Sequence, residues 1–282
     1  MAQEFKKSNY HCHTTYCDGH NSIEEMVCEA IEKNFSVIGL SSHSMYPFAS
    51  DWHIAPREHK NYVEEVKSVK EKYKDKIEVL CGFEADYIPG ICEPSLARYK
   101  EFSPDFLVAS VHYVVGEKGF FEADGKPVDV LAGIRKAFGG NEKKAVQTYF
   151  AEQREMLQKA DFTFLGHPDL IRKQNGKRTL FDENAPWYKR ELKATAKAIS
   201  KSGVCVEINT GGIARGYLTS PYPSIEFLEM LHELNVPVTV NSDAHFKEHL
   251  DFWFDEAFEY AKKAGYTEVM LYTAGSFKAQ KI

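Results

Sequence analysis

Short apolar runs rich in β-branched residues alternate with longer amphipathic segments along the chain. Each run predicts a buried strand, because strands of a covered sheet are apolar on both faces. Strands that alternate with helices form parallel sheets, so the pattern predicts an α/β protein built on a parallel sheet or barrel. The predicted strands cover residues 9–10, 37–41, 77–82, 106–111, 162–165, 204–208 and 237–240, with 268–272 as a candidate eighth.

The amphipathic segments between these runs predict helices, because apolar residues recur on one face with helical spacing. Ser22 and Glu25 form a capping box at the start of the first helix, and Pro56 suits the first turn of the second. Two long polar stretches, 116–127 and 170–186, are predicted to be functional loops or surface insertions. The predicted helices cover residues 22–33, 56–75, 142–160, 187–201, 224–234 and 252–263.

Composition and charge narrow the classes of protein. With 282 residues, 43% hydrophobic and 27% charged, the chain can bury a full core, and without repeats or linkers we expect one domain over residues 1–282. The net charge of -6 has the wrong sign for holding a phosphate backbone, so nucleic acid is not an expected partner. No stretch approaches the roughly 18 apolar residues of a membrane span, and no apolar segment follows Lys6 and Lys7, so we expect a cytoplasmic protein.

Side chains that can bind a metal follow the predicted strands where each strand ends. The carboxyl ends of parallel barrel strands share one rim, so we expect these side chains to converge there. Imidazoles with carboxylates suit zinc, manganese or iron. The donors exceed the needs of one ion, so we expect two to three divalent ions, with Glu84 bridging two of them. The candidate ligands are His11, His13, Asp18, His43, Glu84, His112, His167, Asp243 and His245.

Some neighbouring residues have open roles. His20 competes with Asp18 as a ligand, since both closely follow the first histidine pair. Of the remaining histidines, only His53 is expected to reach the rim. Glu207 is expected to orient a ligand rather than bind metal, and Asn209 either contacts substrate or orients a histidine.

Clustered divalent ions predict phosphoester hydrolysis. Ions about 3.5 to 4 Å apart share a hydroxide, lower the pKa of its parent water towards about 7 and neutralise the entering and leaving oxygens. The predicted reaction is in-line attack of that metal-bridging hydroxide on phosphorus. Asp243 or His245 would protonate the leaving alkoxide or orient the hydroxide, and both assignments remain open.

The order of these residues resembles the polymerase and histidinol phosphatase (PHP) superfamily. The resemblance implies a distorted seven-stranded (β/α) barrel, similar to a TIM barrel, that holds a trinuclear metal site. It covers residues 11 to 245. The matching motifs read His11-x-His13, Asp18-Gly19, His43, Glu84, His112, His167 and Asp243-x-His245.

Within the superfamily the chain is most similar to histidinol-phosphate phosphatases, through segments 166–173 and 207–216. That similarity implies hydrolysis of L-histidinol phosphate to L-histidinol and phosphate in histidine biosynthesis. It also implies that Arg172 and Arg215 hold the substrate phosphate, a role that suits the guanidinium group, with Arg178 as a substitute for Arg172.

Other readings remain open. The same site would serve another small-molecule phosphomonoester, or a phosphodiesterase or nuclease, although the acidic charge argues against the last two. A metal-dependent amidohydrolase is disfavoured because the strand ends offer no bridging lysine. An accessory metal-binding domain is disfavoured because the ligand motifs are complete and arginines flank them.

Overall fold

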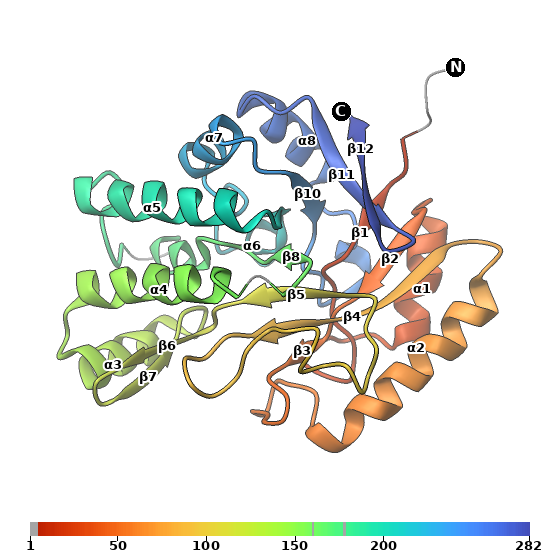
Figure 1. Ribbon diagram of the computed structural model, residues 1–282, viewed down its shortest axis with the longest axis horizontal. Coiled ribbons are helices and arrows are strands. Elements are labelled where there is room, and N and C mark those ends of the chain that lie inside the picture. The colour runs from red at the N-terminus through yellow and green to blue at the C-terminus, as the bar shows by residue number, and fades with distance from the viewer. Residues whose placement is uncertain (1–4, 160, 177–178) are drawn as a thin grey trace.

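The computed structural model describes residues 5–159, 161–176 and 179–282. Within these ranges, seven parallel strands surrounded by helices form a nearly closed barrel (Figure 1). The backbone N–H of His13 donates to the carbonyl of Ala244 at 2.8 Å, which joins the first strand of the barrel to the last. The predicted distorted (β/α)7 barrel is therefore confirmed. In spatial order the strands are β1 (Ser8–Asn9), β2 (Val37–Leu40), β4 (Glu78–Asp86), β5 (Phe106–Ser110), β8 (Phe164–Leu165), β9 (Cys205–Asn209) and β10 (Val238–Asn241).

The six predicted helices are present within a few residues of their expected bounds, although residue 160 of the third lies outside the described ranges. The capping box forms as predicted: the Ser22 hydroxyl accepts from the backbone N–H of Glu25, whose carboxylate accepts from the backbone N–H of Ser22. The helices are α1 (Ile23–Glu32), α2 (His59–Tyr73), α4 (Glu142–Leu157), α5 (Pro186–Ser202), α7 (Ile225–Glu233) and α8 (Phe254–Lys263). Shorter helical turns are η1 (Pro56–Glu58), η2 (Leu170–Asn175), α6 (Gly211–Ala214) and η3 (Lys247–His249).

The first predicted loop contains regular structure instead. β6 (Tyr113–Gly116) pairs antiparallel with β7 (Gly119–Glu122), and the unpredicted helix α3 (Pro127–Phe138) follows. The strands have four residues each, too few for an alternating pattern to stand out. α3 buries only Val130, Ile134 and Ala137, so its apolar face is narrow.

The candidate eighth strand exists but lies outside the barrel. β11 (Glu268–Thr273) pairs antiparallel with β12 (Ser276–Lys281), whereas the two-residue β3 (His43–Ser44) pairs with β4. The hydroxyl of Tyr10 donates to the carbonyl of Tyr272 at 2.8 Å and accepts from its N–H at 2.7 Å. The β11–β12 hairpin is thereby attached to the amino end of the barrel (Figure 1).

Aromatic rings fill the barrel near this amino end. Tyr10 stacks on Phe164 with ring centroids 4.8 Å apart, and Phe106 meets both rings edge-on. Strands β2 and β4 carry Gly39 and Gly82 where the Phe106 ring approaches their backbones. The polar carboxyl ends of the strands lie at the opposite end. None of the helices in the described part of the chain combines the length and apolar composition that crossing a membrane requires.

The packing of Phe106 generates a stability prediction. A Cβ at position 82 would overlap the Phe106 ring, so Gly82→Ala is expected to lower the free energy of unfolding by about 1–3 kcal/mol in urea denaturation. Phe106→Leu makes room for the methyl group, so Gly82→Ala should cost measurably less in that background. An equal loss of unfolding free energy in both backgrounds would show that the Phe106 ring is not what opposes the added methyl group.

Candidate metal centre

The carboxylate of Glu84 lies at the centre of the polar cluster at the carboxyl ends of the strands. β4 carries Glu84, and the register places His43 of β3 directly opposite it. Glu84 Oε2 lies 2.8 Å from His43 Nδ1 and 3.0 Å from His11 Nε2. The carboxylate is fully buried, so its charge depends on these imidazoles rather than on water.

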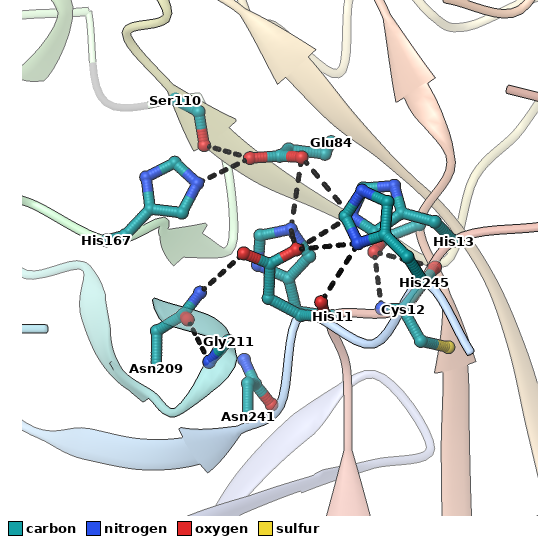
Figure 2. A network of polar contacts seen from close by, with 12 residues as sticks. His11, Cys12, His13, Glu84, Ser110, His167, Asn209, Gly211, Asn241 and His245 are labelled. Atoms are coloured by element: carbon teal, nitrogen blue, oxygen red, sulfur yellow. Dashed lines mark hydrogen bonds and ion pairs between the residues drawn. The ribbon is translucent and has the colours of Figure 1, made fainter. Parts of the chain in front are cut away.

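The second oxygen of Glu84 faces three other side chains. Ser110, at the end of β5, donates its hydroxyl to Oε1 at 2.6 Å. Nε2 of His167 lies 2.9 Å from Oε1, and Nε2 of His112 lies 3.4 Å from it. Figure 2 shows Glu84 between His11 on one side and Ser110 and His167 on the other. One carboxylate thus joins donors from several strands.

Asp243 and Asp18 supply further oxygen atoms. Asp243 follows β10 and brings Oδ1 to 3.1 Å from His13 Nε2. The more exposed Asp18 brings Oδ2 to 3.2 Å from His245 Nε2 and Oδ1 to 3.7 Å from His43 Nε2. All nine predicted ligands therefore lie in one connected cluster.

Four groups of these side chains, among the described residues, place potential donor atoms within 4.8 Å of one another. Glu84 Oε2 lies 2.8 Å from His43 Nδ1 and 3.0 Å from His11 Nε2, but none of these three buried atoms has a partner in hydrogen-bond geometry. Buried polar atoms without partners are costly, and a cation between them would remove that cost. The donor set fits divalent transition metals. The groups are His13, Asp18, His43 and His245; His11, His13 and Asp243; His11, Glu84 and His167; and His43, Glu84 and His112.

The geometry separates the two candidates in the first loop. Asp18 belongs to one of the four groups and lines the cavity described below. The ring of His20 stacks on Phe246 with centroids 4.1 Å apart and belongs to none of the groups. The positions therefore favour Asp18 over His20 as a ligand.

Two buried carboxylates orient the histidines from behind. Glu207 accepts from His11 Nδ1 at 2.9 Å, as expected for a residue that orients a ligand, and Asn209 donates to Glu207 at 2.7 Å. Asp86 similarly accepts from His112 Nδ1 at 2.7 Å, a contact that the sequence analysis missed. The available signal was its place two residues after Glu84 on the same strand, where side chains share a face. With Nδ1 donating, Nε2 of each ring is free to bind metal.

The charges of the cluster determine its ionisation. Burial opposes the charge on Glu84, but His11, His43 and His112 hold the pKa of its carboxyl well below its usual range. Burial favours the neutral ring of His112, yet Asp86 and Glu84 raise its pKa to about 10. Burial and the neighbouring His245 and His43 instead hold the pKa of His13 well below its ordinary value. Metal binding would displace the proton from His112, because only the neutral ring is a ligand.

A cavity of about 590 Å³ opens onto the cluster. Arg215 lies at its edge, where Nη2 donates to Asp243 Oδ2 at 2.8 Å and Nη1 to the Asp243 carbonyl at 2.9 Å. The remaining wall combines the aromatic ring of Trp52 with charged side chains of both signs. The charged residues of that wall are Asp51, Glu122, Asp124, Lys126, Asp129 and Lys173.

Arg172 is placed differently from the expectation. Its buried guanidinium donates to Glu183 at 2.9 Å, to the Ser220 hydroxyl at 3.0 Å and to the Pro221 carbonyl at 3.2 Å. It does not line the cavity, whereas the next residue, Lys173, does. Because the guanidinium of Arg172 lies outside the cavity wall, the structure does not support its expected contact with phosphate. Arg178, the substitute, lies outside the described residues.

A larger cavity of about 770 Å³ lies away from the cluster, between the N-terminal segment and α8. Its wall includes Phe5, Phe254 and Phe258, and its exposed surface is mainly apolar. The smaller cavity contains the clustered donors and is therefore the candidate active site.

Comparisons with known proteins agree with this geometry. The profile of the PHP domain matches residues 9–211. A relative from Schizosaccharomyces pombe, named probable histidinol-phosphatase, is 26% identical over 274 residues, which cover 90% of this chain and 84% of the relative.

Two solved structures share the fold. A Listeria monocytogenes protein proposed to be a histidinol phosphatase superposes with a TM-score of 0.78 at 22% identity, over 89% of this chain and 99% of the other. Histidinol phosphate phosphatase from Lactococcus lactis, solved with zinc, L-histidinol and phosphate, superposes with a TM-score of 0.69 at 19% identity, over 98% of this chain and 100% of the other. At these identities the likeness establishes the barrel.

The central carboxylate generates a metal-binding prediction. Glu84→Gln removes the charge that faces several imidazoles, so zinc affinity should fall about 100-fold or more, as removal of one buried charged partner costs about 3–5 kcal/mol. Zinc titration against a fluorescent chelator measures the change. Glu152→Gln is the matched control, because Glu152 is buried on α4 and accepts from the Val115 N–H outside the cluster. Unchanged affinity in Glu84→Gln would exclude Glu84 as a ligand.

Proposed function

The chain belongs to the PHP domain family, and we propose that it is a metal-dependent phosphatase that hydrolyses L-histidinol phosphate to L-histidinol and phosphate. The observation that carries the proposal is the convergence of nine imidazole and carboxylate ligands beside a cavity whose edge holds an arginine. The named relative and the Lactococcus lactis protein, solved with L-histidinol and phosphate, support this choice of substrate.

The residues of the cluster would hold two to three divalent ions, with Glu84 between two of them. Zinc, manganese and iron all suit the donor set. When bound, such ions supply Lewis-acid chemistry: they lower the pKa of a water molecule towards about 7 and neutralise charge on phosphate oxygens. Glu207 and Asp86 keep His11 and His112 in the tautomer that leaves Nε2 free.

We assign phosphate binding to Arg215. Its guanidinium lines the cavity beside Asp243 and His245, close to the donor cluster. A guanidinium offers paired N–H donors that match two phosphate oxygens, and its charge is permanent. Lys173 lines the same cavity and adds a second positive charge, which the carbonyl and carboxylate of Asp124 partly satisfy.

Orientation of the attacking water and protonation of the leaving alkoxide are the roles assigned to Asp243 and His245. Burial opposes ionisation of Asp243, but Arg215 and His11 hold the pKa of its carboxyl well below its usual range. The ionised carboxylate accepts hydrogen bonds and therefore orients the attacking water. His245 lines the cavity, and we assign protonation of the leaving alkoxide to it in the state in which its ring carries a proton and does not bind metal.

The acidic side of the cavity favours histidinol phosphate over nucleotides. Asp51, Glu122, Asp124 and Asp129 outnumber Lys126 and Lys173 on this wall, so the excess negative charge would attract the substrate's amine and repel additional phosphates. This arrangement also disfavours the alternative of a phosphodiesterase or nuclease. Another phosphomonoester with a cationic group remains the second candidate.

The proposal extends to the organisation of the chain. We propose that residues 1–282 act as one catalytic domain in the cytoplasm, with no nucleic-acid partner. In support, the barrel strands extend from Ser8 to Asn241, and the C-terminal hairpin is hydrogen-bonded to Tyr10 inside the barrel.

A substrate panel tests the function. Zinc- or manganese-loaded protein should release phosphate from L-histidinol phosphate with a kcat/KM at least about 100-fold above that for glycerol phosphate or AMP, the equivalent of about 2.7 kcal/mol of selective binding. Treatment with a chelator should abolish the activity, and added metal should restore it. Equal rates across the panel would overturn the substrate assignment but leave the assignment as a phosphatase in place. No phosphate release from any metal-loaded sample would overturn both.

The two arginines provide a matched pair of variants. Arg215→Lys keeps the charge but loses the paired donors, so KM for L-histidinol phosphate should rise about 10-fold and inhibition by inorganic phosphate should weaken. Arg172→Lys should leave KM unchanged and lower the free energy of unfolding by about 1–3 kcal/mol, because it breaks buried hydrogen bonds. Steady-state kinetics and urea denaturation measure the two effects. A rise in KM in Arg172→Lys alone would reverse the assignment.

A further inference from the structure

Asp86 is a buried carboxylate outside the proposed ligand set. It lies two residues after Glu84 on β4, so both side chains project from the same face of the strand. Only 1% of Asp86 is exposed, and each of its oxygens has an imidazole partner. His112 Nδ1 donates to Oδ1 at 2.7 Å, and His53 Nε2 donates to Oδ2 at 2.5 Å. A buried charge of this kind persists only when its partners satisfy it.

His53 connects Asp86 to the segment that follows β3. Its Nδ1 lies 2.7 Å from the hydroxyl of Ser50, so both ring nitrogens are hydrogen-bonded. The ring also stacks on its neighbour Trp52, with centroids 3.8 Å apart and planes inclined by 29°. Trp52 is therefore supported on one face by the His53 ring, which is itself hydrogen-bonded to Asp86.

Trp52 is part of the cavity wall and contacts the metal-binding cluster. It lines the cavity and meets the rings of His43 and His112 edge-on, at centroid distances of 4.7 and 5.5 Å. On its other side it lies parallel to Tyr113 of β6, with centroids 5.7 Å apart. A shift of this indole would change the shape of the cavity and the packing of two proposed ligands together.

We propose that Asp86 is a positioning residue that couples the substrate cavity to the metal centre: it fixes the metal-facing nitrogen of His112 and, through His53, the Trp52 wall. The inference rests on the proposed function, because it assigns the Trp52 wall to the phosphomonoester substrate. Through Oδ1 the carboxylate keeps the proton of His112 on Nδ1, which leaves Nε2 facing Glu84. Through Oδ2 it holds the cavity wall.

The Oδ1 contact is tested by metal binding. Asp86→Asn keeps the shape of the side chain but can accept from only one of its two imidazole partners. Zinc affinity, measured against a fluorescent chelator, should fall about 10–100-fold, as is typical when a partner of a metal-binding histidine is lost. The matched control is Asp105→Asn, because Asp105 precedes β5 at the amino end and accepts from the Cys81 N–H. Wild-type zinc affinity together with a wild-type KM in a folded Asp86→Asn protein would overturn the role of Asp86, because a single acceptor cannot serve both rings.

The Oδ2 contact is tested by a pair of His53 variants with both kinetics and zinc titration. His53→Leu removes the donor to Asp86, so KM for L-histidinol phosphate should rise about 10-fold, while zinc affinity should fall less than in Asp86→Asn, because the contact between Asp86 and His112 remains. His53→Gln retains a side-chain N–H and should restore KM towards the wild-type value. Equal KM values in the two variants would show that His53 only fills space, and would overturn the coupling.

The two proposals fail in distinguishable ways. If the wild-type protein releases no phosphate from any phosphomonoester, the proposed function fails, and zinc affinity of Asp86→Asn still tests the contact with His112. If the wild type is active, Asp86→Asn behaves like Asp105→Asn and the two His53 variants behave alike, the proposed coupling by Asp86 is overturned. The proposed phosphatase activity is then unaffected. Thermal unfolding of each variant separates loss of coupling from loss of the fold.

Discussion

The burial of the Glu84 charge is the constraint on which the rest of the site depends. A carboxylate removed from water is stable only with compensating partners, and here these are imidazoles on both oxygens and the Ser110 hydroxyl. These partners come from different strands, so they meet only when the barrel closes. The contacts around Oε2 are close ion pairs without hydrogen-bond geometry, so Glu84 Oε2, His11 Nε2 and His43 Nδ1 lack hydrogen bonds, and a cation between them would complete the cluster.

Stability and chemistry are separated along the barrel axis. At the amino end, Tyr10, Phe106 and Phe164 fill the interior and the β11–β12 hairpin is bonded to it. This packing holds the strands together mainly through aromatic contacts, and the Tyr10 hydroxyl adds hydrogen bonds to Tyr272. At the carboxyl end the interior is polar, and its charged groups destabilise the fold unless they are paired. The apolar end can therefore support a cluster whose donors are arranged for binding rather than for stability.

The insertions between strands supply part of the cavity wall. The segment after β3 contributes Trp52, and the segment around the β6–β7 hairpin contributes Glu122 and Asp124. Arg215 and members of the donor cluster line the same cavity. A small molecule that carries both a phosphate and a cationic group would find partners of both signs there. The barrel thus supplies the candidate metal-binding donors, and the insertions supply most of the other charged groups around them.

The sequence by itself determined the alternation of strands and helices and, through its resemblance to the PHP superfamily, the barrel and the donor cluster, but it left Asp18 and His20 as competing members. Apolar runs reveal strands, and a residue at the end of a strand in a parallel barrel has a known place at the rim. The β6–β7 hairpin was missed because its strands are short. Helix α3 was missed because its apolar face is narrow. Only the tertiary structure decided the partners of individual side chains. Arg172 donates hydrogen bonds to Glu183 and Ser220. Asp86 accepts hydrogen bonds from both His53 and His112. Such pairings join segments distant in sequence, and no local periodicity specifies which charged groups will meet when the chain closes.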